Sequence, residues 1–247
     1  MRYCGSKRKF MKYLLPILTK DMTENDTFVD LFGGGMNVVC DIPCKNKYVF
    51  DNNKYVIALW NELKENGMVN IPKTVTEMKY NSVKRAYING GDGYPDYVIG
   101  YVGICASFGS SWFNGYARFN PNRNEDHIKE AYNSLKKQVE NFKNLDTTTF
   151  IYDSYENVEK YVDIDKAIIY CDPPYASTKK YESDFDNLKF WNWVREVSLF
   201  TRNMYISEYE APADFKTIWE MQKKDSLGRK VGEKQNIKVE KLFVYGN

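Results

Sequence analysis

Short apolar runs occur toward both ends of this 247-residue sequence, and apolar residues at helical spacing occupy its middle. Runs rich in β-branched and aromatic residues predict buried strands at residues 27–32, 47–51, 149–152 and 167–171. Further strands are expected at 204–207, 215–221 and 239–245. The linker at 223–236, with Gly228 and Gly232, is typical of a loop between antiparallel strands. Helices are expected at residues 9–20, 55–65, 72–88 and 97–108, from Asp126 to about 144, and from Asp186 to about 202. This alternation predicts an α/β fold.

The motif Asp172-Pro173-Pro174-Tyr175 directly follows the strand expected at 167–171. Two prolines end the strand because neither can donate a ladder hydrogen bond. The motif therefore lies at a strand's carboxyl end, where open α/β sheets bind ligands. Asp172 and the carbonyl of Pro173 could accept both N–H bonds of an exocyclic amine, and Tyr175 could stack on a flipped base. Taken alone, the four residues fit a strand-ending turn equally well.

A second motif, Gly33-Gly34-Gly35, follows the strand at 27–32 and precedes a helix start expected at 36–40. Asp51 ends the next strand about twenty residues past Asp30, the spacing at which an acid binds ribose hydroxyls in nucleotide-binding βαβ units. Glycines admit a ligand close to the backbone, and a helix amino end favours a carboxylate. An ordinary glycine turn is the alternative, but the D-P-P-Y motif after a later strand favours a nucleotide cofactor.

Together these motifs resemble the Dam-like DNA adenine methyltransferases, most closely their small phage-borne members. The resemblance covers nearly the whole chain and includes the order of glycine loop, recognition insert and D-P-P-Y. The catalytic residues it implies are Asp172, Pro173, Pro174 and Tyr175, with family-like Thr178 and Tyr181 after them. The cofactor-binding residues it implies are Tyr3, Lys7, Asp30, Phe32, Gly33, Gly34, Gly35, Asp51, Asp153 and Asp172. Met36 departs from the family, because a glycine is common at its position.

The resemblance implies a Rossmann-like methyltransferase domain with a mixed sheet, formed by residues 1–54 and 148–247. Residues 55–147 would form an inserted, mainly helical module for target recognition. Its implied DNA-binding residues are Trp112, Asn114, Tyr116, Arg118 and Asn120. Amides and arginine read base edges, and aromatic rings fill the gap that a flipped base leaves. The alternative is a loop packed on the insert's own core.

The function implied is site-specific transfer of a methyl group from S-adenosylmethionine to the exocyclic amine of a flipped adenine. The transfer would be a direct displacement without a metal. A cytosine-N4 methyltransferase and a catalytically silent DNA-binding module of the same fold are the alternatives. Motif order and Asp172 favour adenine, and a nucleotide-binding oxidoreductase would leave D-P-P-Y without a role.

Composition limits the setting of this function. The formal net charge is only +2, so a face for double-stranded DNA must come from local clustering of basic residues. Five cysteines and one histidine disfavour structural zinc and suit reduced thiols in a bacterial cytoplasm. No apolar stretch or signal core predicts a membrane span or secretion. A monomer or weak dimer is expected; a cognate restriction endonuclease is a candidate partner, and phage encoding would suit the resemblance.

Overall fold

The computed structural model describes residues 1–175, 185–224 and 237–246. The chain divides into two compact units, residues 1–155 and 156–247. Each unit combines strands with helices, so the predicted α/β class is confirmed. No helix among the described residues is both long and apolar enough to cross a membrane.

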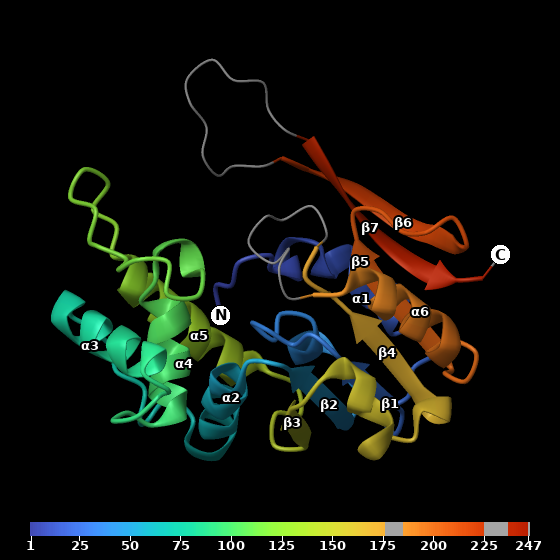
Figure 1. The fold of residues 1–247 in the computed structure, drawn as a ribbon, viewed down its shortest axis with the longest axis horizontal. Coiled ribbons are helices and arrows are strands. Elements are labelled where there is room, and N and C mark those ends of the chain that lie inside the picture. Colours follow the sequence, from blue (N-terminus) through green and yellow to red (C-terminus); the bar gives the residue numbers. More distant parts are fainter. Residues whose placement is uncertain (176–184, 225–236, 247) are drawn as a thin grey trace. The chain divides into compact units, whose positions relative to one another are not determined.

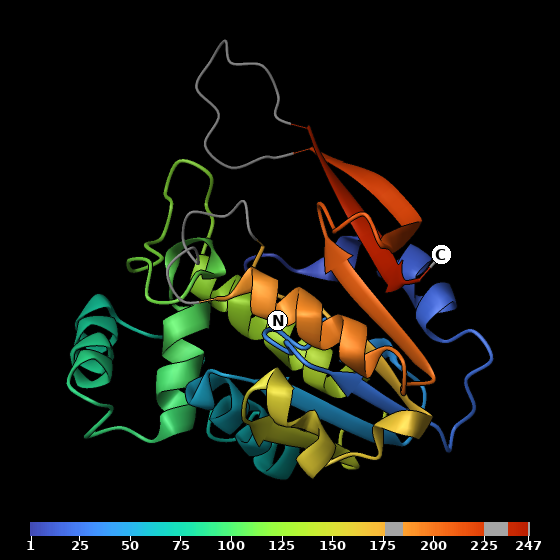
Figure 2. The ribbon, with the colours of Figure 1, turned by 45° about the vertical axis from the view of Figure 1, so that its right-hand side comes forward.

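Three parallel strands form the sheet of the first unit. They are β1 (Thr27–Asp30), β2 (Asn46–Asp51) and β3 (Thr148–Tyr152), in the order β3-β2-β1. Helix α1 (Met11–Leu18) precedes them and contains Pro16 two residues before its end. Between β2 and β3 the chain forms α2 (Lys54–Asn66), α3 (Glu77–Ile88), α4 (Asp96–Cys105) and α5 (His127–Asn141). Helix α4 packs against α2 and α3, and α2 in turn packs against β2 and β3 (Figures 1 and 2).

Side-chain caps fix where three of these helices begin. The side chain of Asn53 accepts hydrogen bonds from the first turn of α2, and Thr76 does the same for α3. Asp126 accepts the Lys129 N–H at the start of α5, so the predicted cap is confirmed. Each cap satisfies backbone N–H groups that have no partner within the helix.

The second unit contains β4 (Ala167–Cys171), α6 (Asn187–Val197), β5 (Asn203–Glu208), β6 (Phe215–Lys224) and β7 (Ile237–Tyr245). Strands β4 and β5 are parallel, whereas β7 lies between β5 and β6 and is antiparallel to both (Figure 1). The predicted antiparallel ending is therefore confirmed. The linker residues 225–236, with Gly228 and Gly232, lie outside the described part of the chain.

The prediction that a helix starts directly after the glycine loop is wrong. Residues 37 and 38 form a turn, and a single 3-10 turn, Val39–Asp41, follows them. Pro43 lies too close for an α-helix to repay the cost of its first turn. The argument that a helix amino end faces the cofactor fails with it. Helices α3, α4 and α6 are also shorter than predicted.

A buried cation lies near the start of β2. Lys47 is only 1% exposed, and its ammonium donates to the carbonyl oxygens of Val39, Ile42 and Lys143. The Nζ atom also lies 4.7 Å from the ring centroid of Phe142. Burial lowers the pKa of Lys47 to about 8, because the charged form loses its hydration.

Lys47 should make stability depend on alkaline pH. The folded protein releases this proton near pH 8, but the unfolded chain keeps it until near 10.5, so stability rises as pH passes between these values. Between pH 7 and pH 9.5 the free energy of unfolding should rise by about 2 kcal/mol relative to Lys47→Met. Urea titrations of both proteins at several pH values measure this difference. Parallel pH profiles would contradict the assignment.

Candidate active site

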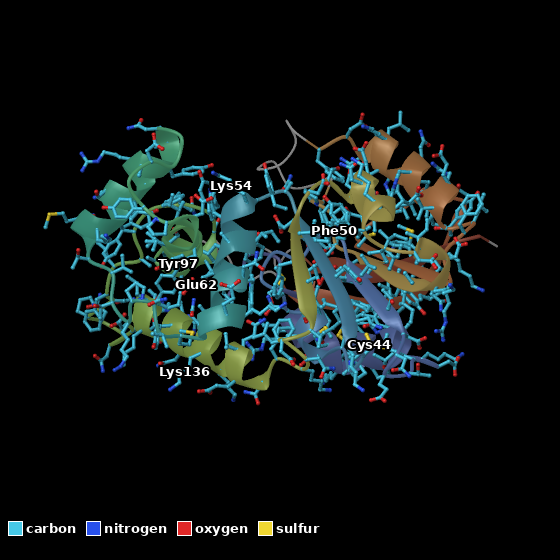
Figure 3. All side chains as sticks on the ribbon, turned by 90° about the horizontal axis from the view of Figure 1, so that it is seen from below. Cys44, Phe50, Lys54, Glu62, Tyr97 and Lys136 are labelled. Atoms are coloured by element: carbon cyan, nitrogen blue, oxygen red, sulfur yellow. The ribbon has the colours of Figure 1, made fainter. Side chains whose placement is uncertain are left out.

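The carboxylate of Asp51, the last residue of β2, holds the glycine loop in place. Its Oδ2 accepts the Gly34 N–H at 2.8 Å, and its Oδ1 accepts the Asn53 N–H at 2.8 Å. The Gly33 N–H donates to the Phe50 carbonyl at 2.8 Å, which fastens the loop to the same strand. In Figure 3 Phe50 and Cys44 lie toward opposite ends of β2. The loop therefore sits at the strand's carboxyl end, as predicted.

Two opposed effects act on the pKa of Asp51. Burial raises the pKa of Asp51, and the hydrogen bonds from the Asn53 and Gly34 N–H groups oppose that rise. Each oxygen accepts one hydrogen bond from the backbone and has capacity for a second donor. Both oxygens of this carboxylate could therefore bind ribose hydroxyls without releasing the loop.

Tyr3 covers the glycine loop, although it lies about thirty positions earlier in the chain. Gly34 has φ of +46°, and a Cβ atom there would meet the Tyr3 ring at 2.8 Å. A Cβ atom at Gly35 would lie 2.6 Å from the Cβ atom of Tyr3. The Tyr3 side chain thus lies so close to the loop backbone that no residue larger than glycine fits at position 34 or 35. The structure brings together three residues that the sequence assigned to one site.

Met36 adopts the backbone conformation that a glycine would favour. Its φ is +55°, and its side chain is fully buried. The sulfur lies 2.9 Å from the position of a Cβ atom on Gly33, so it fills the space beside that glycine. The departure from the family's loop therefore exchanges backbone freedom for a packed thioether.

Gln138 on α5 holds the far side of the loop and was not predicted. Its Nε2 donates to the carbonyls of Gly35 at 3.0 Å and Met36 at 3.1 Å, and the residue is only 4% exposed. A glutamine within the apolar stripe of α5 was the available signal. Its partners lie a hundred positions away, so the stripe alone could not identify them.

Asp30 and Phe32 lie beside the loop at the end of β1. Asp30 is buried, and its carboxylate accepts the Phe32 N–H at 3.3 Å. The ring of Phe32 lies 5.5 Å from that of Tyr155. These contacts place both predicted residues next to Gly33.

Lys7 and Asp153 have local contacts within the same unit. Lys7 is buried, and its Nζ donates to the Gly5 carbonyl at 3.4 Å. Asp153 follows β3 directly, and its carboxylate accepts the Ser154 N–H at 2.7 Å. Their roles toward a cofactor stay predictions.

The D-P-P-Y motif leaves β4 in the second unit. Asp172 is half-buried, and the Tyr175 hydroxyl donates to the carboxylate of Glu240 on β7. Burial raises the pKa of Tyr175 well above its usual value, and the carboxylates of Asp172 and Glu240 act in the same direction. The phenol therefore stays protonated and can act only as a donor to Glu240. Thr178 and Tyr181 lie outside the described residues.

Ser207 and Glu208 end the neighbouring strand β5 and were not predicted. Cys171 pairs with Ile206, so Ser207 lies at the level where Asp172 leaves β4. Ser207 and Glu208 are both buried. Their signal was available, since an acid after a strand had already identified Asp51.

The residues proposed to contact DNA divide into packed and exposed sets. Trp112 stacks on Tyr55 at 6.0 Å, and Tyr116 donates its hydroxyl to the Val75 carbonyl at 2.7 Å. These two rings thus support the insert's own core, as the alternative reading anticipated. Their contact with DNA stays a prediction.

Asn114 and Arg118 are exposed, and Asn120 is half-buried. Arg118 forms an ion pair with Glu77 at the start of α3, with Nε 3.2 Å from the carboxylate. Phe119 lies next to Arg118 and is 53% exposed, which is unusual for a large apolar side chain.

A family model for D12 class N6 adenine-specific DNA methyltransferases matches residues 3–238. The chain belongs to this family. The matched range spans the amino-terminal element, the glycine loop and D-P-P-Y. Membership of an adenine-specific DNA methyltransferase family is confirmed, whereas the motif order and the likeness to phage-borne members stay predictions.

Two curated relatives are modification enzymes. Type II methyltransferase M.FokI of Planomicrobium okeanokoites is 27% identical over 218 residues, which cover 81% of this chain and 32% of the relative. Modification methylase StsI of Streptococcus sanguinis is 26% identical over 227 residues, or 85% of this chain and 33% of the relative. The chain thus spans about a third of each relative's length.

Solved structures give more distant likenesses. The rRNA methyltransferase aviRa from Streptomyces viridochromogenes has a TM-score of 0.45 and 9% identity over 99% of this chain and 86% of its own. An rRNA methylase from Streptococcus thermophilus has a TM-score of 0.36 and 11% identity over 94% and 93% of the two chains. Neither likeness supports a substrate for this chain.

Met36 provides a test of the loop's conformation. An alanine variant is usually more stable than a glycine variant, but at φ of +55° this order should reverse. Met36→Gly should therefore be more stable than Met36→Ala by about 1 kcal/mol. Both variants should be about 2–4 kcal/mol less stable than the wild type, because each loses a buried side chain. Urea denaturation of the three proteins measures both differences. An alanine variant more stable than the glycine variant would rule out the left-handed conformation.

Proposed function

We propose that this chain is a site-specific DNA methyltransferase that transfers a methyl group from S-adenosylmethionine to the exocyclic N6 of a flipped adenine. The match to the adenine-specific family over residues 3–238, which includes the intact Asp172–Tyr175 motif, is the observation that carries this proposal. A cytosine-N4 enzyme would not explain a match to an adenine-specific family. A silent module would not require the complete motif.

The residues of the first unit suit an adenosine cofactor. Asp51 would bind the ribose hydroxyls, while Gly34 and Gly35 would let the cofactor approach the backbone. Tyr3, Lys7, Asp30, Phe32 and Asp153 are proposed to line the rest of this site. S-adenosylmethionine supplies an electrophilic methyl group on a positively charged sulfur.

The chain's own contribution to the reaction is alignment of the amine. Asp172 and the carbonyl of Pro173 would accept its two N–H bonds and direct the lone pair toward the methyl carbon. The new N–C bond would form as the S–C bond breaks, with the electron pair of that bond left on sulfur. The nitrogen would then carry positive charge until it releases one proton to water. Tyr175 would hold the flipped base by stacking.

The insert at 55–147 is proposed to contact double-stranded DNA through Asn114, Arg118 and Asn120. Trp112 and Tyr116 would act chiefly by supporting this loop. The names of the two curated relatives favour a role in modification, with a restriction endonuclease for the same site as a candidate partner. A bacterial cytoplasm, a monomeric or weakly dimeric enzyme and phage encoding remain part of the proposal.

Asp172→Ala should abolish methyl transfer without unfolding the protein. The contact matters most as positive charge develops on the amine, so the turnover number should fall by more than about a hundredfold. Tritiated S-adenosylmethionine and DNA from cells without adenine methylation provide the assay, and digestion identifies the modified base. Substantial turnover by the variant would refute the mechanism, and methylcytosine as product would refute the adenine assignment.

Asp51→Ala should weaken binding of S-adenosylmethionine by about ten- to a hundredfold, because charge-assisted hydrogen bonds to the ribose are lost. Calorimetry measures the affinity. Asp146→Ala is a matched control, since its carboxylate is exposed in the same unit. Equal affinities of the two variants would exclude Asp51 from the cofactor site.

Arg118→Ala should weaken DNA binding by about 1–3 kcal/mol. Glu77→Gln should strengthen it severalfold, because Glu77 competes with DNA for the arginine. Fluorescence anisotropy at two salt concentrations tests both, with a phosphate contact giving a flatter salt dependence in Arg118→Ala.

Lys166→Ala is the control, since it breaks an exposed ion pair of the second unit with Asp163. If Arg118→Ala binds DNA normally but melts at a lower temperature, Arg118 only anchors its loop.

A further inference from the structure

The carboxyl-terminal strands hold the tyrosine of the D-P-P-Y motif. The Tyr175 hydroxyl donates to the carboxylate of Glu240, which is only 1% exposed. The Tyr175 ring lies perpendicular to that of Tyr209, with 4.6 Å between the ring centroids. The Nζ atom of Lys238 lies 5.0 Å from the centroid of the Tyr209 ring. Glu240 and Tyr209 thus contact Tyr175 directly, and Lys238 lies against Tyr209.

Strand pairing explains why these residues meet. Glu208 of β5 pairs with Lys241 of the antiparallel strand β7. The next position along this ladder brings Tyr209 level with Glu240. Glu240 also pairs with Met221 of β6, so it lies on the middle strand of three. Glu240 is thus paired with β6, and the next residue, Lys241, is paired with both β5 and β6, which suits a residue that orients another side chain.

A buried carboxylate is costly unless hydrogen bonds compensate for its lost hydration. The Tyr175 phenol supplies such a bond, and bonds from hydroxyl groups to carboxylates are among the strongest in proteins. A phenyl ring attached only by its Cβ atom could rotate and swing. The bond to its hydroxyl holds the far end of the ring and keeps it from swinging, and the edge-on contact with Tyr209 restricts rotation of the ring plane. Stacking on a base requires both.

We propose that Glu240 is a positioning residue for Tyr175, fixing the ring on which the flipped adenine stacks. This inference rests on the proposed function. In this proposal Glu240 acts on the reaction through its bond to the Tyr175 hydroxyl. Sequence motifs could not have identified it, because 65 positions separate the two residues.

A double-mutant cycle tests this role. Glu240→Met keeps the side chain's bulk but removes the acceptor, and Glu240→Gln restores an acceptor oxygen. We expect Glu240→Met to lower kcat about tenfold with unchanged affinity for S-adenosylmethionine, and Glu240→Gln to recover most of the loss. Tyr175→Phe should lose as much as Glu240→Met. Adding Glu240→Met to Tyr175→Phe should then cost nothing further.

Glu220→Met is the matched control, since this glutamate is exposed on the neighbouring strand β6 and should leave kcat unchanged. Multiplying losses in the double variant, or full activity of Tyr175→Phe, would overturn the inference. A lowered melting temperature with normal kcat in Glu240→Met would overturn it too. If Glu240→Met does not fold, Tyr175→Phe and Glu240→Gln still decide. An inactive wild type, or an active Asp172→Ala variant, would instead refute the proposed function.

Discussion

The bond from the Gly34 N–H to the Asp51 carboxylate is the constraint on which the first unit's site depends. It joins the glycine loop to the end of β2, and the other oxygen of the same carboxylate binds the N–H of Asn53. Asn53 in turn caps α2, so one side chain fixes a loop, a strand end and a helix start. Tyr3 and Gln138 close the loop from other directions. A site assembled this way needs little rearrangement to receive a ligand.

The proposed cofactor site around Asp51 and the proposed catalytic site around Tyr175 share one structural feature. In each unit a carboxylate on a strand is withdrawn from water and accepts a fixed donor. Asp51 accepts backbone N–H groups, whereas Glu240 accepts a phenol. Such donors compensate for lost hydration, so the carboxylates can order their surroundings without unfolding them.

The sequence predicted those parts of the fold and site that depend on neighbouring residues. The strands and the Asp126 cap follow from local patterns and are confirmed. The D-P-P-Y motif could be placed at a strand end because proline stops a ladder wherever the strand lies. The helix expected after the glycine loop failed because pattern alone did not weigh the nearby Pro43.

Residues whose contacts span long stretches of sequence could not be found this way. Gln138 and Glu240 look like ordinary polar residues until strand and helix packing brings their partners near. Trp112 gives a further case, because an aromatic ring in a polar loop predicted base contact, and the sequence did not show that this ring also packs on Tyr55. Composition cannot separate these outcomes, since both use the same residue types.

Helix α5 is anchored at two points, one on the glycine loop that follows β1 and one on β2. Gln138 grips the loop at one end of β2, and the carbonyl of Lys143, just past the helix, receives the ammonium of Lys47 toward the other. Sliding the helix by one residue, about 1.5 Å, would break both attachments. It can therefore move only together with β2. Because α5 is held at both points, a displacement of its amino-terminal end would be transmitted directly to the glycine loop.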